Sequence, residues 1–254
     1  MRLDRHLVHA GLAPSRTAAA RLIREGRVLV HHREVRKPAL DVAAEVPVRI
    51  LPGPGADWVS RAGHKLDGAL RAFPDVVVAG RRCLDAGAST GGFTQVLLHR
   101  GAARVVAVDV GHDQLHPSLR ADPRVQVHEG LNVRHLDPEA IGGPVQLTVG
   151  DLSFISLTLV LPALRAATAP GGELVLMVKP QFEVGRSGLD KHGVVRDEAT
   201  RQAGIRAVLE AAADLGLQIR AAADSALPGQ DGNREHFLHL HRPTGDLGSV
   251  SPLA

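Results

Sequence analysis

Residues 83–98 read CLDAGASTGGFTQVLL, and this stretch decides the fold. The apolar residues at its start predict a short strand that ends at Asp85, and a glycine-rich turn and a new helix follow. Glycines let a ligand approach the backbone closely, and the first turn of a helix offers free N–H groups. The stretch therefore predicts an α/β fold with a ligand at its first turn. A tight turn without a ligand is the alternative.

The rest of the chain continues this pattern of strands and helices. A long helix is expected from Glu198 to about Leu215. Apolar runs that predict strands occupy 83–86, 104–110, 124–128, 145–150, 173–178, 217–223 and 236–241. Strands that alternate with helices form a mostly parallel sheet covered on both faces, and the closing pair predicts an antiparallel hairpin at its edge. The expected fold is a Rossmann-like, seven-stranded α/β sheet.

A small module precedes this sheet. Helical spacing of apolar residues predicts a helix from Leu3 that ends at Gly11, and Ser15 is a suitable N-cap for a second helix over Arg16–Glu25. The run at 28–30 and the alternation at 46–50 predict short strands. The predicted domains are 1–50, a linker at 51–58 that contains LPGPGAD, a large domain at 59–242, and a disordered tail at 243–254.

The charge of the chain is concentrated in the small module. Residues 1–58 carry 10 basic and 6 acidic residues, whereas the remainder carries 20 and 21. We expect Arg16, Arg24 and Arg27 to share one helix face, opposite a buried face, and to bind a polyanion such as RNA. Aromatic residues make up only 2% of the chain, which favours recognition of RNA shape and phosphate over base stacking. Further candidate contacts are Arg5, Arg61, Arg134 and Arg186.

Composition excludes several classes of protein. Hydrophobic residues make up 44% of the chain, which suits a globular core, and no apolar run reaches the ~18 residues of a membrane helix. The charged N-terminus does not fit a signal peptide, and Cys83, the single cysteine, cannot form an internal disulfide. We therefore expect a cytoplasmic protein. Its oligomeric state is left open by the sequence, and a monomer is one of the alternatives. The 14 histidines form no recognisable metal motif, so no metal site is expected.

Polar residues at strand ends predict where a ligand lies. Asp109 ends the second strand, 22 residues after Gly87, where a carboxylate can accept hydrogen bonds from a ribose diol. These features predict an adenosine cofactor, either NAD or S-adenosylmethionine. Asp151 and Lys179 end later strands, whose carboxyl ends face the ligand crevice. Lys65 lies on a predicted helix and is, like Lys179, one of only four lysines.

With these residues in place, the chain resembles the TlyA-type ribosomal RNA 2′-O-methyltransferases, historically labelled hemolysins, whose catalytic domain is similar to FtsJ-type enzymes. The motifs that carry the resemblance are RLDRHLVHAGLAPSR, typical of an S4 RNA-binding domain, then WVSRAGHKL, DAGASTGGFT, VDVGHDQL, DLSFISL, VKPQFEVG and GNREHFL. The chain departs from the usual pattern at His31-His32, where Asn-Gly is common, and at Arg61-Ala62-Gly63, which often reads Arg-Gly-Gly.

The resemblance implies a small N-terminal α+β S4 domain that is followed in the sequence by a domain with the class I methyltransferase fold. It implies S-adenosylmethionine as cofactor and cytidines of 16S or 23S ribosomal RNA, free or in subunits, as substrate. It places the catalytic Lys-Asp-Lys-Glu set on Lys65, Asp151, Lys179 and Glu235. The expected cofactor-binding residues are Asp85, Gly87, Ala88, Ser89, Thr90, Gly91, Gly92, Phe93, Asp109, Val110, Asp151 and Phe154.

The chemistry expected of these residues follows from their charges. Lys179 is expected to act as a base or to stabilise the developing oxyanion, with Lys65 and Glu235 as positioning groups and Asp151 as an orienting group. The glycine-rich, basic loop at 185–197 is expected to act as a lid that orders on RNA. Three alternatives are a non-catalytic RNA-binding or ribosome-assembly factor, a pore-forming hemolysin, and an NAD enzyme. The complete catalytic set counts against a non-catalytic factor. The lack of a membrane-active helix counts against a hemolysin, and the paired lysines count against an NAD enzyme.

Overall fold

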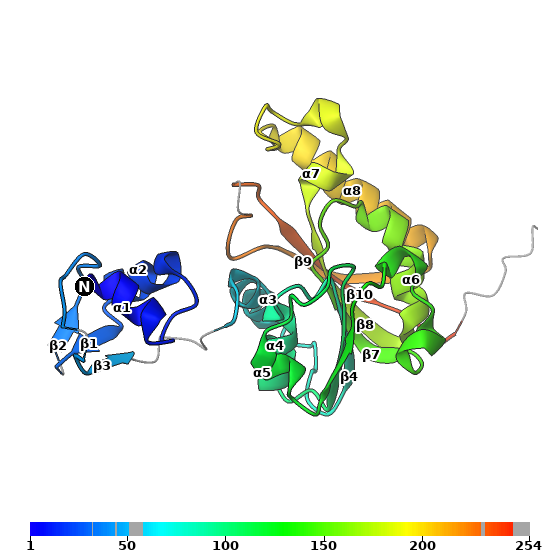
Figure 1. The fold of residues 1–254 in the computed structure, drawn as a ribbon. Helices are drawn as coiled ribbons and strands as arrows, with labels where there is room; N and C mark the ends of the chain where they lie inside the picture. The colour runs from blue at the N-terminus through cyan, green and yellow to red at the C-terminus, as the bar shows by residue number, and fades with distance from the viewer. Residues whose placement is uncertain (32, 44, 51–57, 230–231, 246–254) are drawn as a thin grey trace, which may run out of the picture. The chain divides into compact units, whose positions relative to one another are not determined.

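The computed structural model describes residues 1–31, 33–43, 45–50, 58–229 and 232–245. Its chain divides into two compact units, Met1–Asp57 and Trp58–Ala254 (Figure 1). The predicted linker at 51–58 lies outside the described residues except for Trp58, and so does the predicted tail beyond residue 245. Each unit is therefore considered by itself.

The first unit packs two helices on a three-stranded antiparallel sheet. Its elements are α1 (Leu3–His9), α2 (Arg16–Arg24), β1 (Val28–Val30), β2 (Arg33–Val35) and β3 (Val48–Ile50), and the strand order is β2-β1-β3. The Ser15 hydroxyl accepts a hydrogen bond from the Ala18 N–H at 3.2 Å and so caps α2 as predicted. Fully buried Leu3, Leu7 and Ile23 form the centre of a small core. Strand β2 was not predicted, because its sequence, REV, has a single apolar residue.

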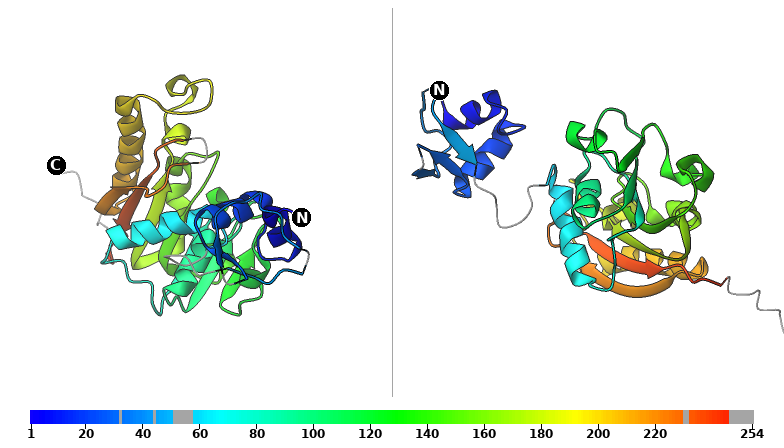
Figure 2. Two further views of the ribbon diagram at one scale, coloured as in Figure 1. Left: turned by 90° about the vertical axis from the view of Figure 1, so that its left-hand side faces the viewer. Right: turned by 90° about the horizontal axis from the view of Figure 1, so that it is seen from below.

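The second unit is a seven-stranded sheet with helices on both faces (Figures 1 and 2). Its strands are β4 (Arg82–Ala86), β5 (Arg104–Val108), β6 (Val125–His128), β7 (Val145–Gly150), β8 (Thr168–Val178), β9 (Gln218–Asp224) and β10 (His236–His241). Its helices are α3 (Arg61–Ala72), α4 (Gly92–His99), α5 (Pro117–Arg120), α6 (Leu157–Ala167), α7 (Pro180–Glu183) and α8 (Glu198–Asp214), with short 3₁₀ turns at Val133–His135, Pro138–Ile141 and Arg186–Gly188.

The strand order β6-β5-β4-β7-β8-β10-β9 confirms the predicted topology. Strands β4 to β8 pair in parallel, whereas β10 pairs antiparallel with both β8 and β9. The two closing strands thus form the expected antiparallel hairpin at the edge of the sheet. The Rossmann-like α/β prediction is confirmed.

Alternation along the strands supplies a separate core to each face of the sheet. Leu84 and Val106 pack with α6 and α8, whereas their neighbours Cys83 and Val105 pack with α3, α4 and α5. All four are fully buried. Since successive side chains of a strand point to opposite faces, near-continuous apolar strands require helices on both sides.

Strand β8 is longer than its sequence indicates. The apolar run predicts 173–178, but the strand begins at Thr168 and includes APGG at 169–172. Pairing compensates for the weak local preference, because Gly171 N donates to Arg242 O at 2.7 Å and Arg242 N donates to Gly172 O at 2.9 Å. Tertiary hydrogen bonds can override local propensity in this way.

The register brings the chemically interesting residues to one end of the sheet. Ala86 pairs with Val108 on one side and with Gly150 on the other, and Gly150 pairs with Leu176. The segments that follow these strands therefore leave the sheet at the same level. Because β10 runs antiparallel and His236 pairs with Val178, the segment before β10 reaches this end as well.

Candidate active site

Glycine is required at the turn after β4. Gly87 has φ +86°, and a Cβ there would lie 2.8 Å from the Asp151 carbonyl oxygen. Gly91, with φ +94°, precedes α4, and a Cβ on it would meet the Leu119 side chain. Both the backbone conformation and the close approach of other elements thus exclude larger residues. The turn leaves open space beside Gly87 at the carboxyl end of the sheet.

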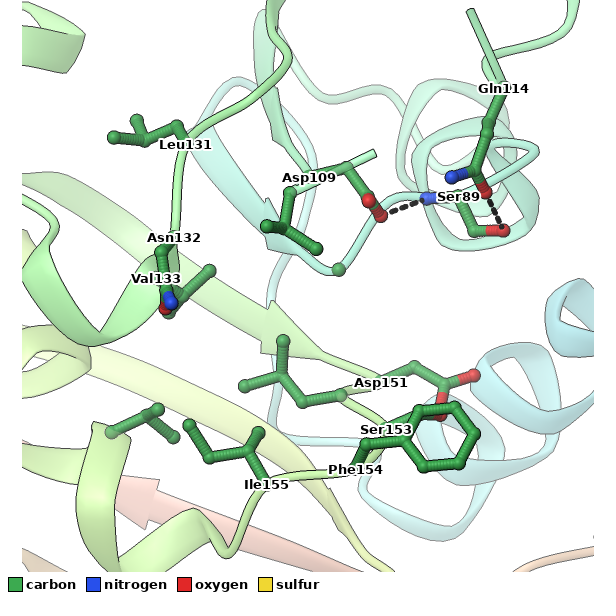
Figure 3. A pocket seen from close by; sticks show the side chains of 14 residues that line it. Ser89, Asp109, Gln114, Leu131, Asn132, Val133, Asp151, Ser153, Phe154 and Ile155 are labelled. Carbon is green, nitrogen blue, oxygen red and sulfur yellow. Dashed lines mark hydrogen bonds between the residues drawn. The ribbon is translucent and has the colours of Figure 1, made fainter. Parts of the chain in front are cut away.

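Asp109 faces this turn from the end of β5. One carboxylate oxygen accepts a hydrogen bond from Ser89 N at 2.8 Å (Figure 3), and the other accepts one from Gly111 N at 2.7 Å. A carboxylate offers about four acceptor positions, so two backbone bonds leave room for further donors. Asp109 is therefore held rigidly and can still accept hydrogen bonds from a diol.

A first cavity of about 500 Å³ opens between Asp109 and the segment after β7. Figure 3 shows Asp109 and Ser89 on one side of it and Asp151, Ser153 and Phe154 on the other. The volume lies in the range of small-molecule sites. The predicted residues that line it are Gly87, Ser89, Asp109, Val110, Asp151 and Phe154.

The other predicted cofactor residues lie around this cavity rather than in its lining. Ala88, Thr90 and Phe93 line a separate, smaller cavity of about 260 Å³ beside the start of α3. The Phe93 ring is buried and stacks on Phe237 with centroids 6.2 Å apart, so most of its surface belongs to the core. Gly91 and Gly92 shape the turn without lining either cavity.

Asp85 lies beneath the turn and is completely buried. Burial raises the pKa of its carboxyl to about 7, against the opposing effect of a hydrogen bond that Thr94 Oγ1 donates at 2.7 Å. Its Oδ1 atom has no hydrogen-bond partner among the described residues. Asp85 therefore supports the turn from below and does not line the first cavity.

Two buried ion pairs bring the four predicted catalytic residues to the same end of the sheet. Lys179 Nζ lies 2.7 Å from Asp151 Oδ1 and donates a hydrogen bond to Ser153 Oγ at 2.6 Å. Lys65, on α3, pairs with Glu235, which directly precedes β10. Both lysines are over 90% buried, with exposed fractions of 8% and 9%. Charges at this depth are stable only when paired, as these are.

Both ion pairs border a second cavity of about 800 Å³. Lys65, Lys179 and Glu235 line it, and it shares Ser153, Phe154 and Ile155 with the first cavity. Two ligands, one in each cavity, would thus meet at the segment after β7. Two adjoining cavities with Lys179 beside their shared segment suit a transfer reaction between a cofactor and a substrate.

Phe154 stands at the junction of the two cavities. Its side chain is 92% exposed, its φ is +63°, and its ring centroid lies 5.4 Å from that of Phe182. An exposed aromatic ring in a strained backbone conformation at a cavity is typical of functional sites. The prediction gave Phe154 to the cofactor alone, whereas it lines both cavities.

The candidate RNA-binding arginines differ in their exposure. Arg5, Arg16 and Arg24 are exposed on the first unit, although Arg16 also pairs with buried Asp4 at 3.3 Å. The prediction that Arg27 shares their helix face is wrong: α2 ends at Arg24, and Arg27 is 9% exposed beside Glu25. Gly26, with φ +73°, turns the chain before Arg27 and directs it into β1. On the second unit the exposed arginines are Arg61, Arg134 and Arg186, of which Arg186 lines the second cavity.

The loop at 185–197 is tied into the second unit by specific hydrogen bonds. Asp190 accepts from His192 N, Val194 N and Arg196 Nε at 2.8 to 2.9 Å, and these bonds lower the pKa of its carboxyl to about 2. Asn233 accepts from Val195 N and donates to Gly193 O, both at 3.0 Å. These bonds tie the loop to itself and to Asn233, and its predicted ordering on RNA stays a prediction.

Sequence reasoning missed several residues of the first cavity. They are Gln114, Leu131, Asn132, Val133, Leu152, Ser153, Ile155 and Val160. Leu131, Asn132 and Val133 follow β6, whose carboxyl end lies at the same end of the sheet as that of β5. Applying the strand-end argument to this third strand would have found them.

Two negative findings concern the described residues. They contain no group of three or more histidine, cysteine, aspartate or glutamate side chains placed to hold a metal ion. Over the same part of the chain, every helix is too short or too polar to cross a membrane.

Comparison with known proteins assigns a family to both units. Residues 58–242 match the model of the FtsJ-like methyltransferases, and residues 1–46 match the S4 domain. A Mycobacterium tuberculosis protein named 16S/23S rRNA (cytidine-2′-O)-methyltransferase TlyA is 52% identical over 96% of this chain and 90% of its own. Hemolysin A of Brachyspira hyodysenteriae is 35% identical over 94% of this chain and 99% of its own.

Solved structures agree with this assignment. A Streptococcus thermophilus protein named as a hemolysin superposes with a TM-score of 0.74 at 36% identity, and the match covers 98% of this chain and 91% of that one. The resemblance seen in the sequence is thereby confirmed, together with the expectation of a methyltransferase. The chain belongs to the FtsJ-like methyltransferase family and, with its S4 domain, to the TlyA-type members of that family.

Proposed function

We propose that this protein transfers a methyl group from S-adenosylmethionine to the ribose 2′-OH of cytidines in ribosomal RNA. The observation that carries the proposal is the pair of adjoining cavities with Lys179 and Asp151 at their junction. The specificity for ribosomal RNA cytidines rests on the activity named for the Mycobacterium tuberculosis relative. A cytoplasmic location, where ribosomal subunits are found, is part of the proposal.

The first cavity fits the proposed cofactor. Asp109 retains acceptor capacity for a ribose diol, and Gly87 lines the cavity with backbone alone, so that no side chain separates a ligand from the turn. Val110 is 66% exposed and offers an apolar surface to a flat ring, while Asp151 offers a carboxylate to a positive group. When bound, S-adenosylmethionine supplies an activated methyl group on a positively charged sulfur.

The second cavity fits the target nucleotide. Lys179 forms an ion pair with Asp151 and donates one of the three N–H groups of its ammonium to Ser153. The ammonium can donate a further hydrogen bond to a ribose oxygen, which favours Lys179 as the group that holds the 2′-oxygen and stabilises its developing negative charge. Lys65 and Glu235, which line the same cavity, are proposed to position the nucleotide, and Phe154 offers it a ring.

The S4 unit is proposed to supply affinity for RNA. Replacing Arg5, Arg16 and Arg24 together by glutamine should weaken RNA binding and reduce its salt dependence, because phosphate contacts release counterions. Affinity for S-adenosylmethionine should not change. Arg27→Gln is the matched control, since Arg27 is buried and its loss should lower stability more than affinity. An unchanged salt dependence in the triple variant would contradict this role.

The rival functions make different predictions. A non-catalytic assembly factor would bind ribosomal RNA without transferring methyl groups, and a hemolysin would lyse membranes. Relatives carry both methyltransferase and hemolysin names, but the matched family is a methyltransferase family.

The test is nucleoside analysis of RNA after reaction. Purified protein is incubated with isotopically labelled S-adenosylmethionine and with 16S or 23S RNA, free or in subunits, and the RNA is digested to nucleosides. The proposal predicts labelled 2′-O-methylcytidine with the wild-type protein and, over the same reaction time, about 10²–10⁴-fold less with Lys179→Ala. Label on a base, or no label on any of these RNAs, would contradict it.

A further inference from the structure

Two neighbouring segments carry the groups at the junction of the cavities, and the structure links them at three points. The first segment, 151–156, joins β7 to α6 and carries Asp151, Ser153 and Phe154. The second, 179–183, follows β8 and carries Lys179 and Phe182. Two of the links face the cavities: Lys179 with Asp151 and Ser153, and Phe154 with Phe182.

The third link lies behind the cavities and is made by Glu183. One of its carboxylate oxygens accepts a hydrogen bond from Leu157 N at 2.9 Å, and the other accepts one from Ser156 Oγ. Ser156 in turn accepts from Thr158 N at 3.2 Å as the N-cap of α6. Glu183 thus joins the end of the Lys179 segment to the end of the Asp151 segment, and it satisfies the first free N–H of a helix.

The surroundings of Glu183 indicate a fixed position. Burial raises the pKa of its carboxyl, against the lowering effect of its bonds to Ser156 and Leu157. Residue 204 of α8 is glycine, and a Cβ there would lie 3.2 Å from Glu183 Cβ. A partly buried carboxylate that accepts two hydrogen bonds and lies close to the glycine of a neighbouring helix has little freedom to move.

We propose that Glu183 is a positioning residue for methyl transfer, which fixes the Asp151 segment relative to the Lys179 segment through Ser156 and the start of α6. The inference rests on the proposed function. Glu183 lines neither the first nor the second cavity, so it acts through Asp151 and Lys179 and not on a ligand. Small displacements matter in such a site, because productive geometry is lost when reacting groups move by about 1 Å.

The test compares Glu183→Ala and Glu183→Gln with a control substitution on β8, the strand that precedes the Lys179 segment. Glutamine keeps the length and one oxygen acceptor for Leu157 N, whereas alanine keeps neither. The control is Glu173→Gln: Glu173 lies on β8 far from its carboxyl end, is partly buried, and pairs with Arg81 and His239. It should lower stability without touching the site.

Single-turnover methyl transfer at saturating S-adenosylmethionine and RNA is measured well below each melting temperature. Glu183→Ala should lose about ten- to a hundredfold in rate, Glu183→Gln should recover most of the rate, and Glu173→Gln should react as fast as wild type. When the RNA concentration is varied, the concentration that gives half the maximal rate should change little in Glu183→Ala. A rate for Glu183→Ala equal to wild type, or equal losses in all three variants, would overturn the proposal.

Hydrogen exchange without cofactor or RNA gives a readout apart from activity. Peptides that cover 151–158 should exchange faster in Glu183→Ala than in wild type. In Glu173→Gln the same peptides should exchange at the wild-type rate. Unchanged exchange in Glu183→Ala would overturn the link itself. If wild type transfers no methyl group, the proposed function fails, while this measurement still decides whether Glu183 holds the two segments together.

Discussion

The two large cavities are built in different ways. The first is shaped by backbone: the turn at Gly87, and the Ser89 and Gly111 N–H groups that hold Asp109, lie within 25 residues of one another. The second depends on side chains from distant parts of the chain, since Lys65 pairs with Glu235 across 170 positions. A local motif can specify the wall of the first cavity between Gly87 and Asp109, whereas its opposite wall after β7 and the whole of the second cavity need the completed sheet. We therefore expect binding and turnover to respond to different substitutions.

The largest effect is expected at Lys179. Lys179→Ala should lower methyl transfer by about 10²–10⁴, which is the usual loss for a positioned acid–base or charge-stabilising group. Calorimetry should show little change in affinity for S-adenosylmethionine. Lys179→Arg separates the two roles, because guanidinium keeps the charge and cannot accept a proton at neutral pH. Sizeable activity in the Arg variant supports oxyanion stabilisation, and full activity in the Ala variant would remove Lys179 from the reaction.

Asp85 tests how strongly the first cavity depends on its buried support. Since burial raises the pKa of Asp85 to about 7 in the folded state, well above its usual range, the unfolded chain loses this proton first as pH rises. The free energy of unfolding should fall by about 3 kcal/mol between pH 5 and 8 through this group. Asp85→Asn removes this titrating group. In urea denaturation, the free energy of unfolding of wild type should therefore fall relative to that of the variant between pH 5 and pH 8. A stability difference that does not change with pH would contradict this.

Asp109 tests the first cavity at its surface. Asp109→Ala should weaken binding of S-adenosylmethionine by about 10- to 100-fold, because hydrogen bonds to a charged group are worth ~1.5–3 kcal/mol. Calorimetry measures the affinity. A melting temperature near that of wild type shows that the loss is not due to unfolding. Unchanged affinity would place the cofactor elsewhere.

The smallest effect is expected at Arg186, at the mouth of the second cavity. It is exposed, so Arg186→Gln should raise KM for RNA by about three- to tenfold and leave affinity for S-adenosylmethionine unchanged. Steady-state kinetics at two salt concentrations measure it, and the difference from wild type should shrink at high salt. A larger effect on cofactor affinity than on RNA would contradict the separation of the two cavities.

The same contrast explains what could be predicted from the sequence. The glycine turn, Asp109, Asp151 and Lys179 all follow strands that are near-continuous apolar runs, so their place at one end of a parallel sheet follows from the pattern alone. Glu235 does not, because its position depends on β10 running antiparallel beside β8. Only the family resemblance identified it in advance.

Other features depend on tertiary contacts that no local pattern reveals. Helix α2 ends three residues before Arg27, and the chain then turns that side chain into a buried position. The exposure of Phe154 also departs from the rule that aromatic rings are buried, and it follows from a positive φ in the segment after β7. Leu131, Asn132 and Val133 differ from these features, because they follow a predicted strand and the pattern would have placed them at the cavity, although none of them carries a charge.

The most direct test is the single-turnover rate of methyl transfer as a function of S-adenosylmethionine concentration, measured for Asp109→Ala and Lys179→Ala. If the first cavity binds the cofactor and the second carries the reaction, saturating cofactor should restore the rate of Asp109→Ala to near wild type. Lys179→Ala should reach its plateau at the wild-type concentration and remain about 10²–10⁴ slower. A rate of Lys179→Ala that recovers with cofactor, or one of Asp109→Ala that does not, would contradict this division between the two cavities.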